Sequence, residues 1–161
     1  MKKYIWIVAS LIILSSVMFS YISYAQGETI KFTKESKIQL HPRESAESGL
    51  ALSLDAVLSN NSSQHSQPYY VVFEITNKQL QKKVKTNKFR PGNLDKTQVL
   101  KPHSTLTPSY TVPLEEDIDL DTLRKIIGDH AVKVNVFNGD HKIIKSNFIT
   151  NFELDIRPEN I

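Results

Sequence analysis

The sequence predicts an all-β protein, an antiparallel sandwich of about seven to nine strands with one short helix. Three observations support this prediction. Short runs rich in β-branched and aromatic residues recur along the chain at spacings of roughly ten residues. Turn-forming residues separate these runs, and apolar residues at helical spacing occur in one segment, residues 118–128.

Residues 1–25 have the pattern of a cleavable secretory signal. Two lysines precede an apolar run that begins at Tyr4, and the small residues Ser23 and Ala25 precede a cleavage position. An uncleaved membrane anchor over residues 4–22 is the alternative, because this stretch approaches the length that spans a bilayer. Both alternatives place the rest of the chain outside the cytoplasm, either secreted or attached to the outer face of the cytoplasmic membrane.

The remaining chain is expected to form a single domain over residues 26–156, followed by a polar tail at residues 157–161. The whole sequence has 20 basic and 17 acidic residues, and two of the lysines lie in the signal segment, so the exported part is nearly neutral. This balance predicts no nucleic-acid partner. The sequence contains no cysteine, which excludes disulfides, thiol nucleophiles and cysteine-ligated zinc.

The strongest strand signal covers residues 69–77. Apolar side chains fall on one face of this run and mixed side chains on the other, the period of two that a half-buried strand requires. The inward set is Tyr69, Val71, Phe73 and Ile75, and the outward set is Tyr70, Val72, Glu74 and Thr76. We expect a central strand whose inward set packs against the leucines of residues 50–58 and against Phe148 and Phe152.

The other strands are expected at residues 29–32, 37–40, 50–58, 97–100, 106–114, 131–137 and 142–154. Asn138 and Gly139 form the strongest hairpin signal in the chain, so the last two strands should pair. One face of the final strand is expected to carry Ile144, Phe148, Phe152, Leu154 and Ile156. The single helix would be capped by Asp119 or Asp121.

Two short motifs carry a resemblance to known modules. Residues 73–77 look like the central strand of immunoglobulin-like and fibronectin-III-like modules found outside bacterial cells. Residues 100–106 resemble the Leu-x-Pro-Gly turn of such modules, with His103 where glycine is usual. Residues 121–123 and 132–136 also resemble desiccation-type, late-embryogenesis sandwich domains. Both resemblances imply an immunoglobulin-like or related sandwich, and neither implies a catalytic residue.

The segment at residues 80–90 supplies the one candidate for ligand contact. Its side chains are polar on both faces, a pattern typical of a sheet edge where lysines block unwanted pairing. The same cations are candidate contacts for a polyanion such as a wall polymer or an anionic lipid surface. They are Lys82, Lys83, Lys85, Lys88 and Arg90.

Two further patterns suggest metal ions. His130 and His141 occur in Gly-Asp-His triplets, but a whole strand separates them, so we interpret the triplets as turns rather than as a shared metal site. The acids of residues 115–121 alternate as in some calcium loops. An EF-hand frame fails because Thr122 and Gly128 occupy its glycine and glutamate positions. Calcium binding and helix capping both remain open for these acids.

The sequence contains no recognisable nucleophile motif, metalloprotease motif or phosphate-binding glycine loop. The expected function is therefore that of a non-enzymatic, exported β-sandwich that binds a protein or polymer partner at a bacterial cell envelope, with no cofactor. One alternative is a secreted enzyme inhibitor with a protruding loop at residues 59–67 or 89–96, or a small secreted enzyme. Another is an anion-binding module that uses residues 82–90.

Overall fold

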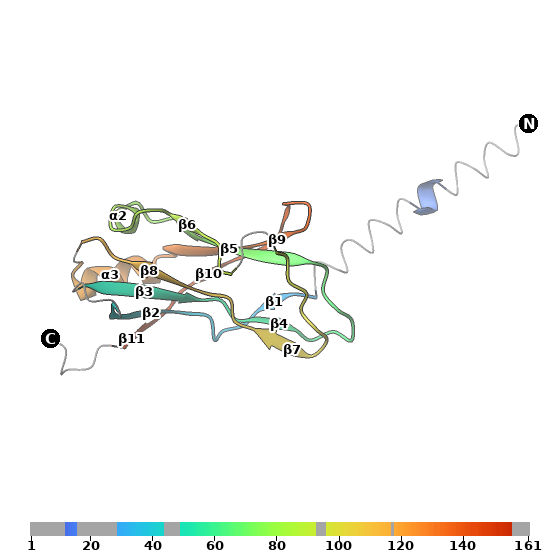
Figure 1. Cartoon of the computed structure of the whole chain (residues 1–161), viewed down its shortest axis with the longest axis horizontal. Coiled ribbons are helices and arrows are strands. Elements are labelled where there is room, and N and C mark those ends of the chain that lie inside the picture. The colour runs from blue at the N-terminus through green and yellow to red at the C-terminus, as the bar shows by residue number, and fades with distance from the viewer. Residues whose placement is uncertain (1–11, 16–28, 44–48, 93–95, 117, 156–161) are drawn as a thin grey trace, which may run out of the picture.

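The structure, a computed structural model, describes residues 12–15, 29–43, 49–92, 96–116 and 118–155 (Figure 1). The predicted signal and the polar tail lie outside these ranges, apart from one helical turn at residues 12–15. Within the described residues, no helix combines the length and the apolarity needed to cross a bilayer. The described part of the domain is all-β, as predicted, with eleven strands in three sheets.

Two four-stranded sheets make up most of the domain. The β5 sheet has the order β10-β9-β5-β6, and its strands are Ile143–Ile149, Val132–Asn138, Tyr69–Ile75 and Lys88–Phe89. The β3 sheet has the order β11-β2-β3-β8, with strands Asn151–Leu154, Lys37–Pro42, Leu50–Asp55 and Ser109–Pro113. A smaller sheet has the order β1-β4-β7, with strands Lys31–Phe32, Leu58–Asn60 and Ser104–Leu106.

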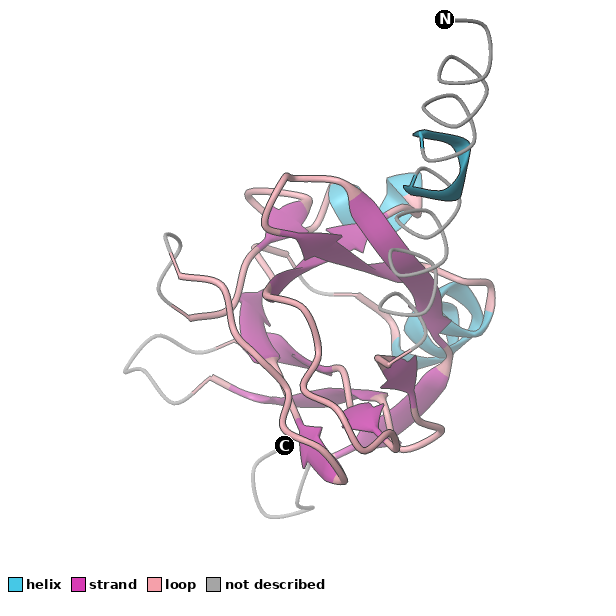
Figure 2. Ribbon diagram, turned by 90° about the vertical axis from the view of Figure 1, so that its right-hand side faces the viewer, coloured by secondary structure: helices cyan, strands magenta, loops and turns pink. Residues whose placement is uncertain are grey.

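Eleven strands are found instead of seven to nine because three expected strands, those at residues 50–58, 106–114 and 142–154, break and continue in a second sheet. They give β3 with β4, β7 with β8, and β10 with β11, while β1 and β2, which were expected as separate strands, form a fourth run divided between two sheets. Residues 97–100, also expected as a strand, make only an isolated antiparallel bridge between Gln98 and Tyr69. Among the described strands every pairing is antiparallel except that of β11 with β2, which is parallel. Figure 2 shows the resulting arrangement, in which the strands surround a common core.

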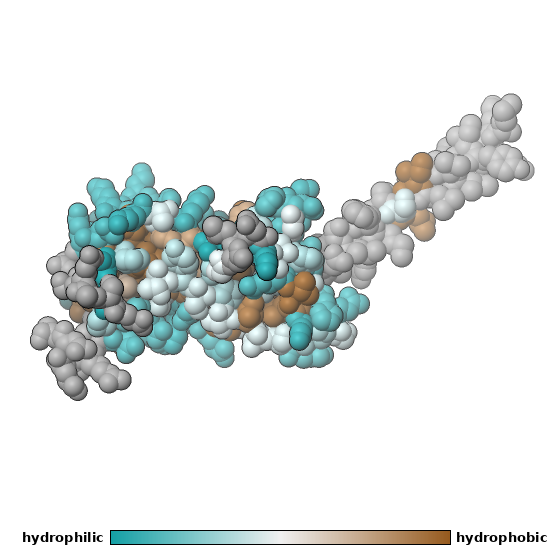
Figure 3. All heavy atoms as spheres, viewed as in Figure 1, coloured by the Kyte–Doolittle hydropathy of each residue, from teal (hydrophilic) through white to brown (hydrophobic). Residues whose placement is uncertain are grey.

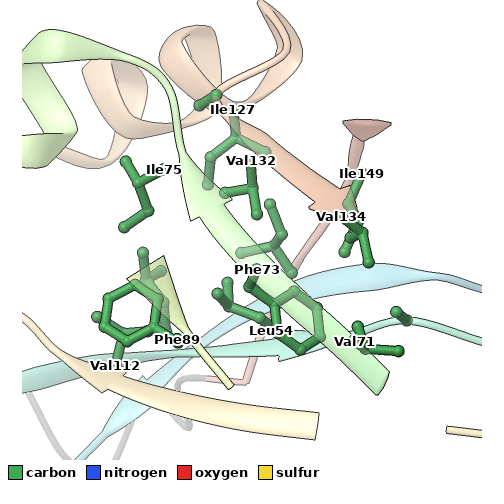
Figure 4. Close-up of a cluster of buried hydrophobic side chains, with 14 of the residues drawn as sticks. Leu54, Val71, Phe73, Ile75, Phe89, Val112, Ile127, Val132, Val134 and Ile149 are labelled. Carbon is green, nitrogen blue, oxygen red and sulfur yellow. The ribbon is translucent and has the colours of Figure 1, made fainter. Parts of the chain in front are cut away.

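The core lies between the two four-stranded sheets. The alternation predicted for residues 69–75 is confirmed, since β5 alternates buried and half-buried side chains along its whole length. Figure 4 shows Phe73 of the β5 sheet close to Leu54 of the β3 sheet, and Phe89 of the β5 sheet close to Val112 of the β3 sheet, all of them buried. The predicted contact of β5 with the leucines of residues 50–58 is therefore found.

The predicted helix is confirmed as α3, Leu120–Gly128. The Asp119 side chain accepts hydrogen bonds from the backbone N–H groups of Asp121 and Thr122 and so caps the helix. Hydrogen bonding by the Thr122 side chain, followed by these backbone N–H groups, lowers the pKa of the Asp119 carboxyl. The apolar residues predicted at helical spacing include Leu123, Ile126 and Ile127, which are buried.

The prediction of an edge strand over residues 80–90 is mostly wrong. Asn77 caps a second short helix, α2 (Lys78–Gln81), by accepting hydrogen bonds from the N–H groups of the second and third residues that follow it. Leu80 and Val84, four residues apart, both enter the core, a helical spacing hidden among the lysines. Only Lys88 and Phe89 form a strand in this segment, and that strand does lie at the sheet edge.

The prediction that the apolar residues of the last strand share a single face is also wrong. The run leaves the β5 sheet after Ile149 and joins the β3 sheet at Asn151, so the alternation is interrupted at Thr150. Ile149 is buried, with 2% exposure, whereas Phe148 is 36% exposed on the outer side of the β5 sheet. A bulge between Ile143 and Lys145 disturbs the alternation a second time.

Candidate functional site

Four side chains form a row across the outer face of the β5 sheet. Tyr70 of β5 lies opposite Phe137 of β9, and Phe137 lies opposite Ile143 of β10. Cross-strand partners project from the same face, so these three side chains lie side by side. Arg90, which follows β6, reaches Tyr70 from the other side. We call Arg90, Tyr70, Phe137 and Ile143 the outer row.

The ring of Tyr70 is held between two other groups. The Phe137 ring is parallel to it, with 5.0 Å between centroids and 3° between planes. The Arg90 guanidinium carbon lies 3.8 Å from the Tyr70 ring centre, a cation–π contact. Since β9 and β6 lie on opposite sides of β5, Phe137 and Arg90 cover opposite faces of the Tyr70 ring.

His141 fixes the polar end of the same tyrosine. Its Nδ1 atom is 2.9 Å from the Tyr70 hydroxyl oxygen, and the two rings meet edge to face with centroids 5.7 Å apart. The ring of Tyr70 thus has contacts on both faces and at its hydroxyl. A side chain fixed in this way loses little further rotamer freedom when a ligand binds.

The polar groups farther along the outer face satisfy one another. Lys88 pairs with Glu74 at 3.1 Å, Asn135 donates to Glu74 at 3.2 Å, and Ser146 donates to Asn135 at 2.7 Å. This chain of contacts crosses all four strands of the β5 sheet. It leaves these side chains with less capacity for an external partner than the outer row has.

The predicted polyanion contacts do not form one cationic patch. Three of the lysines are paired with acids: Lys83 with Glu116 at 2.7 Å, Lys85 with Glu115 at 3.7 Å, and Lys88 with Glu74 at 3.1 Å. The Lys83 contact lowers the pKa of the Glu116 carboxyl. Figure 3 shows hydrophilic residues gathered over α2 and β6, where these lysines lie.

Arg90 differs from these lysines. Among the described residues, Arg90 makes no ion pair with a carboxylate, and neither does Lys82. Arg90 is fixed on an aromatic ring, whereas Lys82 ends helix α2 without such a contact. Of the five predicted cations, Arg90 is therefore the one whose side chain is held in position and is not neutralised by an acid among the described residues.

A small hollow of about 210 Å³ adjoins the outer row. Tyr70 forms part of its wall, together with Pro91, Gln98 and Ser109. Lys96 also lines the hollow and adds a second cation to this end of the face. A negatively charged group near Arg90 would therefore experience a positive potential from two side chains.

Three of the described edge strands, β6, β8 and β10, are protected against pairing with another strand. Strand β6 is only two residues long, and Pro113 ends β8. Strand β10 contains a bulge, and Lys145 lies opposite the buried Val136, which places a charge on the inward-facing side of an edge strand. These features favour the outer face over an edge as a binding surface.

The two histidines of the Gly-Asp-His triplets lie at opposite ends of strand β9. His130 precedes β9 and His141 follows it, and both adopt left-handed backbone conformations, with φ of 59° and 61°. The interpretation of the Gly-Asp-His triplets as turns is confirmed. The β9–β10 hairpin is also confirmed, but His141 takes the left-handed position, while Asn138 accepts hydrogen bonds from backbone N–H groups of the turn.

The described acids of residues 115–121 have partners within the chain. Glu115 lies near Lys85 and Arg43, Glu116 pairs with Lys83, and Asp119 caps α3. Asp121 lies 3.4 Å from Arg124, and Asp117 lies outside the described residues. Within the part of the chain that the structure describes, no group of three or more histidine and acidic side chains is arranged to hold a metal ion.

Sequence reasoning did not identify the partners of Tyr70. The predicted hairpin already places Phe137 and Ile143 on paired strands. Only the register between β5 and β9 brings them beside Tyr70. Comparison of the chain with known protein families and with curated proteins finds no match.

Proposed function

We propose that the protein is a non-enzymatic, exported, immunoglobulin-like β-sandwich that binds a protein or polymer partner at a bacterial cell envelope. The outer row is the binding surface. The observation that carries this proposal is the stack of Arg90, Tyr70 and Phe137, in which a cation and two aromatic rings are fixed on an outer face. Arginine and aromatic side chains are the residues that most often dominate the energy of protein interfaces.

The strand order supports the immunoglobulin-like part of the proposal. When each interrupted run is counted once, the first, second and fifth runs share the β3 sheet. The third, fourth, sixth and seventh share the β5 sheet, in the order seven-six-three-four. Immunoglobulin-like sandwiches group their strands in a closely similar way. The left-handed backbone of His103, with φ of 52°, fits the resemblance in which glycine is usual at this position.

The export part of the proposal rests on the signal pattern of residues 1–25. In such a protein the domain faces the outside of the cytoplasmic membrane, whether the segment is cleaved or retained as an anchor at residues 4–22. The secreted-inhibitor alternative has less support. Its candidate loop at residues 59–67 contains the buried Asn60, whose side chain donates to the carbonyls of Gln64 and Leu100.

Capture from solubilised bacterial envelope fractions tests the proposed function. The bait is the full-length protein, compared with the variants Arg90→Ala and Lys82→Ala. Each variant removes one cation from the same short segment, but only Arg90 belongs to the outer row. The bait is cross-linked to the molecules that it captures. We expect cross-linked products that are lost with the Arg90→Ala bait and kept with the Lys82→Ala bait. Products that both variants retain equally would show that the outer row is not the binding surface.

A further inference from the structure

We infer that the outer row recognises a peptide segment of a partner protein in which a carboxylate lies next to aromatic or aliphatic side chains. This inference rests on the proposed function and specifies the chemistry of the partner. The row presents two kinds of group in a fixed order, a guanidinium at the β6 side and apolar side chains toward β10. A ligand that matches the whole row must offer an anionic group at one end and apolar groups at the other.

The charge at one end of the row favours a carboxylate. The guanidinium of Arg90 presents a planar set of N–H donors that matches a carboxylate or a phosphate. Contact with the Tyr70 ring holds the guanidinium in position without neutralising it, and no acid of the described chain pairs with it. Lys96, in the adjoining hollow, adds to the positive potential at this end.

The apolar end of the row favours a peptide over a phosphate polymer. Ile143 is 55% exposed, and Phe137 is half-buried beside it. A polyphosphate chain would fill the cationic end but would bury none of this apolar surface. A peptide offers both chemistries on one chain, and each buried aliphatic or aromatic side chain adds favourable transfer energy.

The size of the row sets the length of the peptide. The row spans three gaps between neighbouring strands, about 14 Å at the usual spacing of about 4.8 Å. A peptide of about five residues covers this distance in an extended conformation. The ligand therefore lies across the strands, over the face of the sheet, and does not add to its edge.

A titration of the isotopically labelled full-length protein in detergent, followed by NMR, tests the inference. The probes are a blocked pentapeptide of sequence Asp-Gly-Phe-Gly-Leu, its Asn-Gly-Phe-Gly-Leu counterpart, its Asp-Gly-Ser-Gly-Ser counterpart, and inorganic polyphosphate. The affinity for the first peptide should be at least about fivefold higher than the affinity for either of the other two peptides. The amide shifts should centre on Tyr70, Phe137 and Ile143. The advantage of aspartate over asparagine should disappear in Arg90→Ala and persist in Lys82→Ala.

The outcomes separate this inference from the proposed function. Equal affinity for the aspartate and asparagine peptides overturns the inference, and so does tighter binding of polyphosphate than of the first peptide. If envelope capture still depends on Arg90 in either case, the proposed function holds with a partner of another chemistry. If envelope capture is also independent of Arg90, both proposals fail. Near-ultraviolet circular dichroism of each variant checks that the fold is retained.

Discussion

The rings of Tyr70 and Phe137 lie parallel, 5.0 Å between centroids, although the two residues belong to strands far apart in the chain. Their contact depends on the antiparallel register of β5 with β9, and a shift of one residue would move one of the rings to the core. The burial of Tyr69 and Val71 on the opposite face fixes that register. The core therefore determines the geometry of the outer surface.

The charge of Glu74 should limit the affinity of the outer face for acidic ligands. Glu74→Gln removes the negative partner of Lys88 while an amide oxygen can still accept from Asn135. We expect the acidic pentapeptide to bind about two- to threefold more tightly to this variant, because one unit of negative charge is lost near Arg90. Titration at low salt measures this change. The matched variant Glu35→Gln, in an exposed turn away from β5, should change the affinity little; an equal gain in both would contradict the assignment.

Tyr69→Phe should stabilise the protein. Tyr69 is fully buried, and its hydroxyl has no hydrogen-bond partner among the described groups. A buried hydroxyl without a partner costs free energy, so its removal should raise the free energy of unfolding by about 1 kcal/mol. Chemical denaturation of both proteins measures the difference. Tyr110→Phe, on a half-buried ring of β8, is the comparison and should change stability by less than about 0.5 kcal/mol.

The same tyrosine should make the fold sensitive to alkaline pH. Burial raises the pKa of Tyr69 to about 12, because the charged phenolate is poorly solvated in the core. The unfolded chain ionises near the ordinary value of about 10, so stability is complete below that pH and is lost as the pH rises toward 12. The melting temperature of Tyr69→Phe should therefore exceed that of the natural protein by a margin that widens above pH 10. A constant margin would argue against a buried, protonated hydroxyl.

His103→Gly should also stabilise the protein. His103 adopts φ of 52°, a left-handed conformation that costs most L-residues about 1 kcal/mol or more. Glycine adopts it without this cost but gives the unfolded chain more freedom, so the net gain should be about 0.5 kcal/mol. Thermal unfolding measures it. His65→Gly, at an exposed loop position outside the left-handed region, should have the opposite sign.

Substitutions at Phe148 and Ile149 test the break in the last strand. Ile149→Ala should lower the free energy of unfolding by about 2–4 kcal/mol, because its side chain is almost completely buried. Phe148→Ala should cost about 1 kcal/mol or less, since the ring lies on the outer face beside Lys133 and His130. Denaturant titration of both variants measures this contrast. The reverse order would support the uninterrupted alternation that the sequence alone suggests.

Local patterns predicted much of this fold. The alternation at residues 69–75, the cap at Asp119 and the hairpin after Asn138 are each set by residues close together in sequence. The prediction for residues 80–90 is mostly wrong because the segment has only three apolar residues, Leu80, Val84 and Phe89, among many polar ones. With so few positions, periods of two and of 3.6 residues are difficult to distinguish.

The candidate site was harder to predict from the sequence than the fold. Tyr70 was identified as an outward residue of β5, and Arg90 as a cation, but nothing local indicated that they meet. Their contact depends on the turns after α2 and on β6, and the contact with Phe137 depends on long-range pairing. The neutralisation of Lys83, Lys85 and Lys88 is equally non-local, because their acidic partners come from other strands and loops.

The parallel pairing of β11 with β2 determines how the domain would respond to mechanical force. Lys37 lies opposite Asn151, and Leu40 lies opposite Leu154, so the two strands run side by side in the same direction. A pull applied at residue 37 and opposed at residue 154 would load all the hydrogen bonds between these strands in shear at once. Antiparallel strands pulled apart from adjacent ends would instead break one bond after another, at lower force. Tension applied between the two ends of this pair would therefore be resisted by all of its hydrogen bonds together.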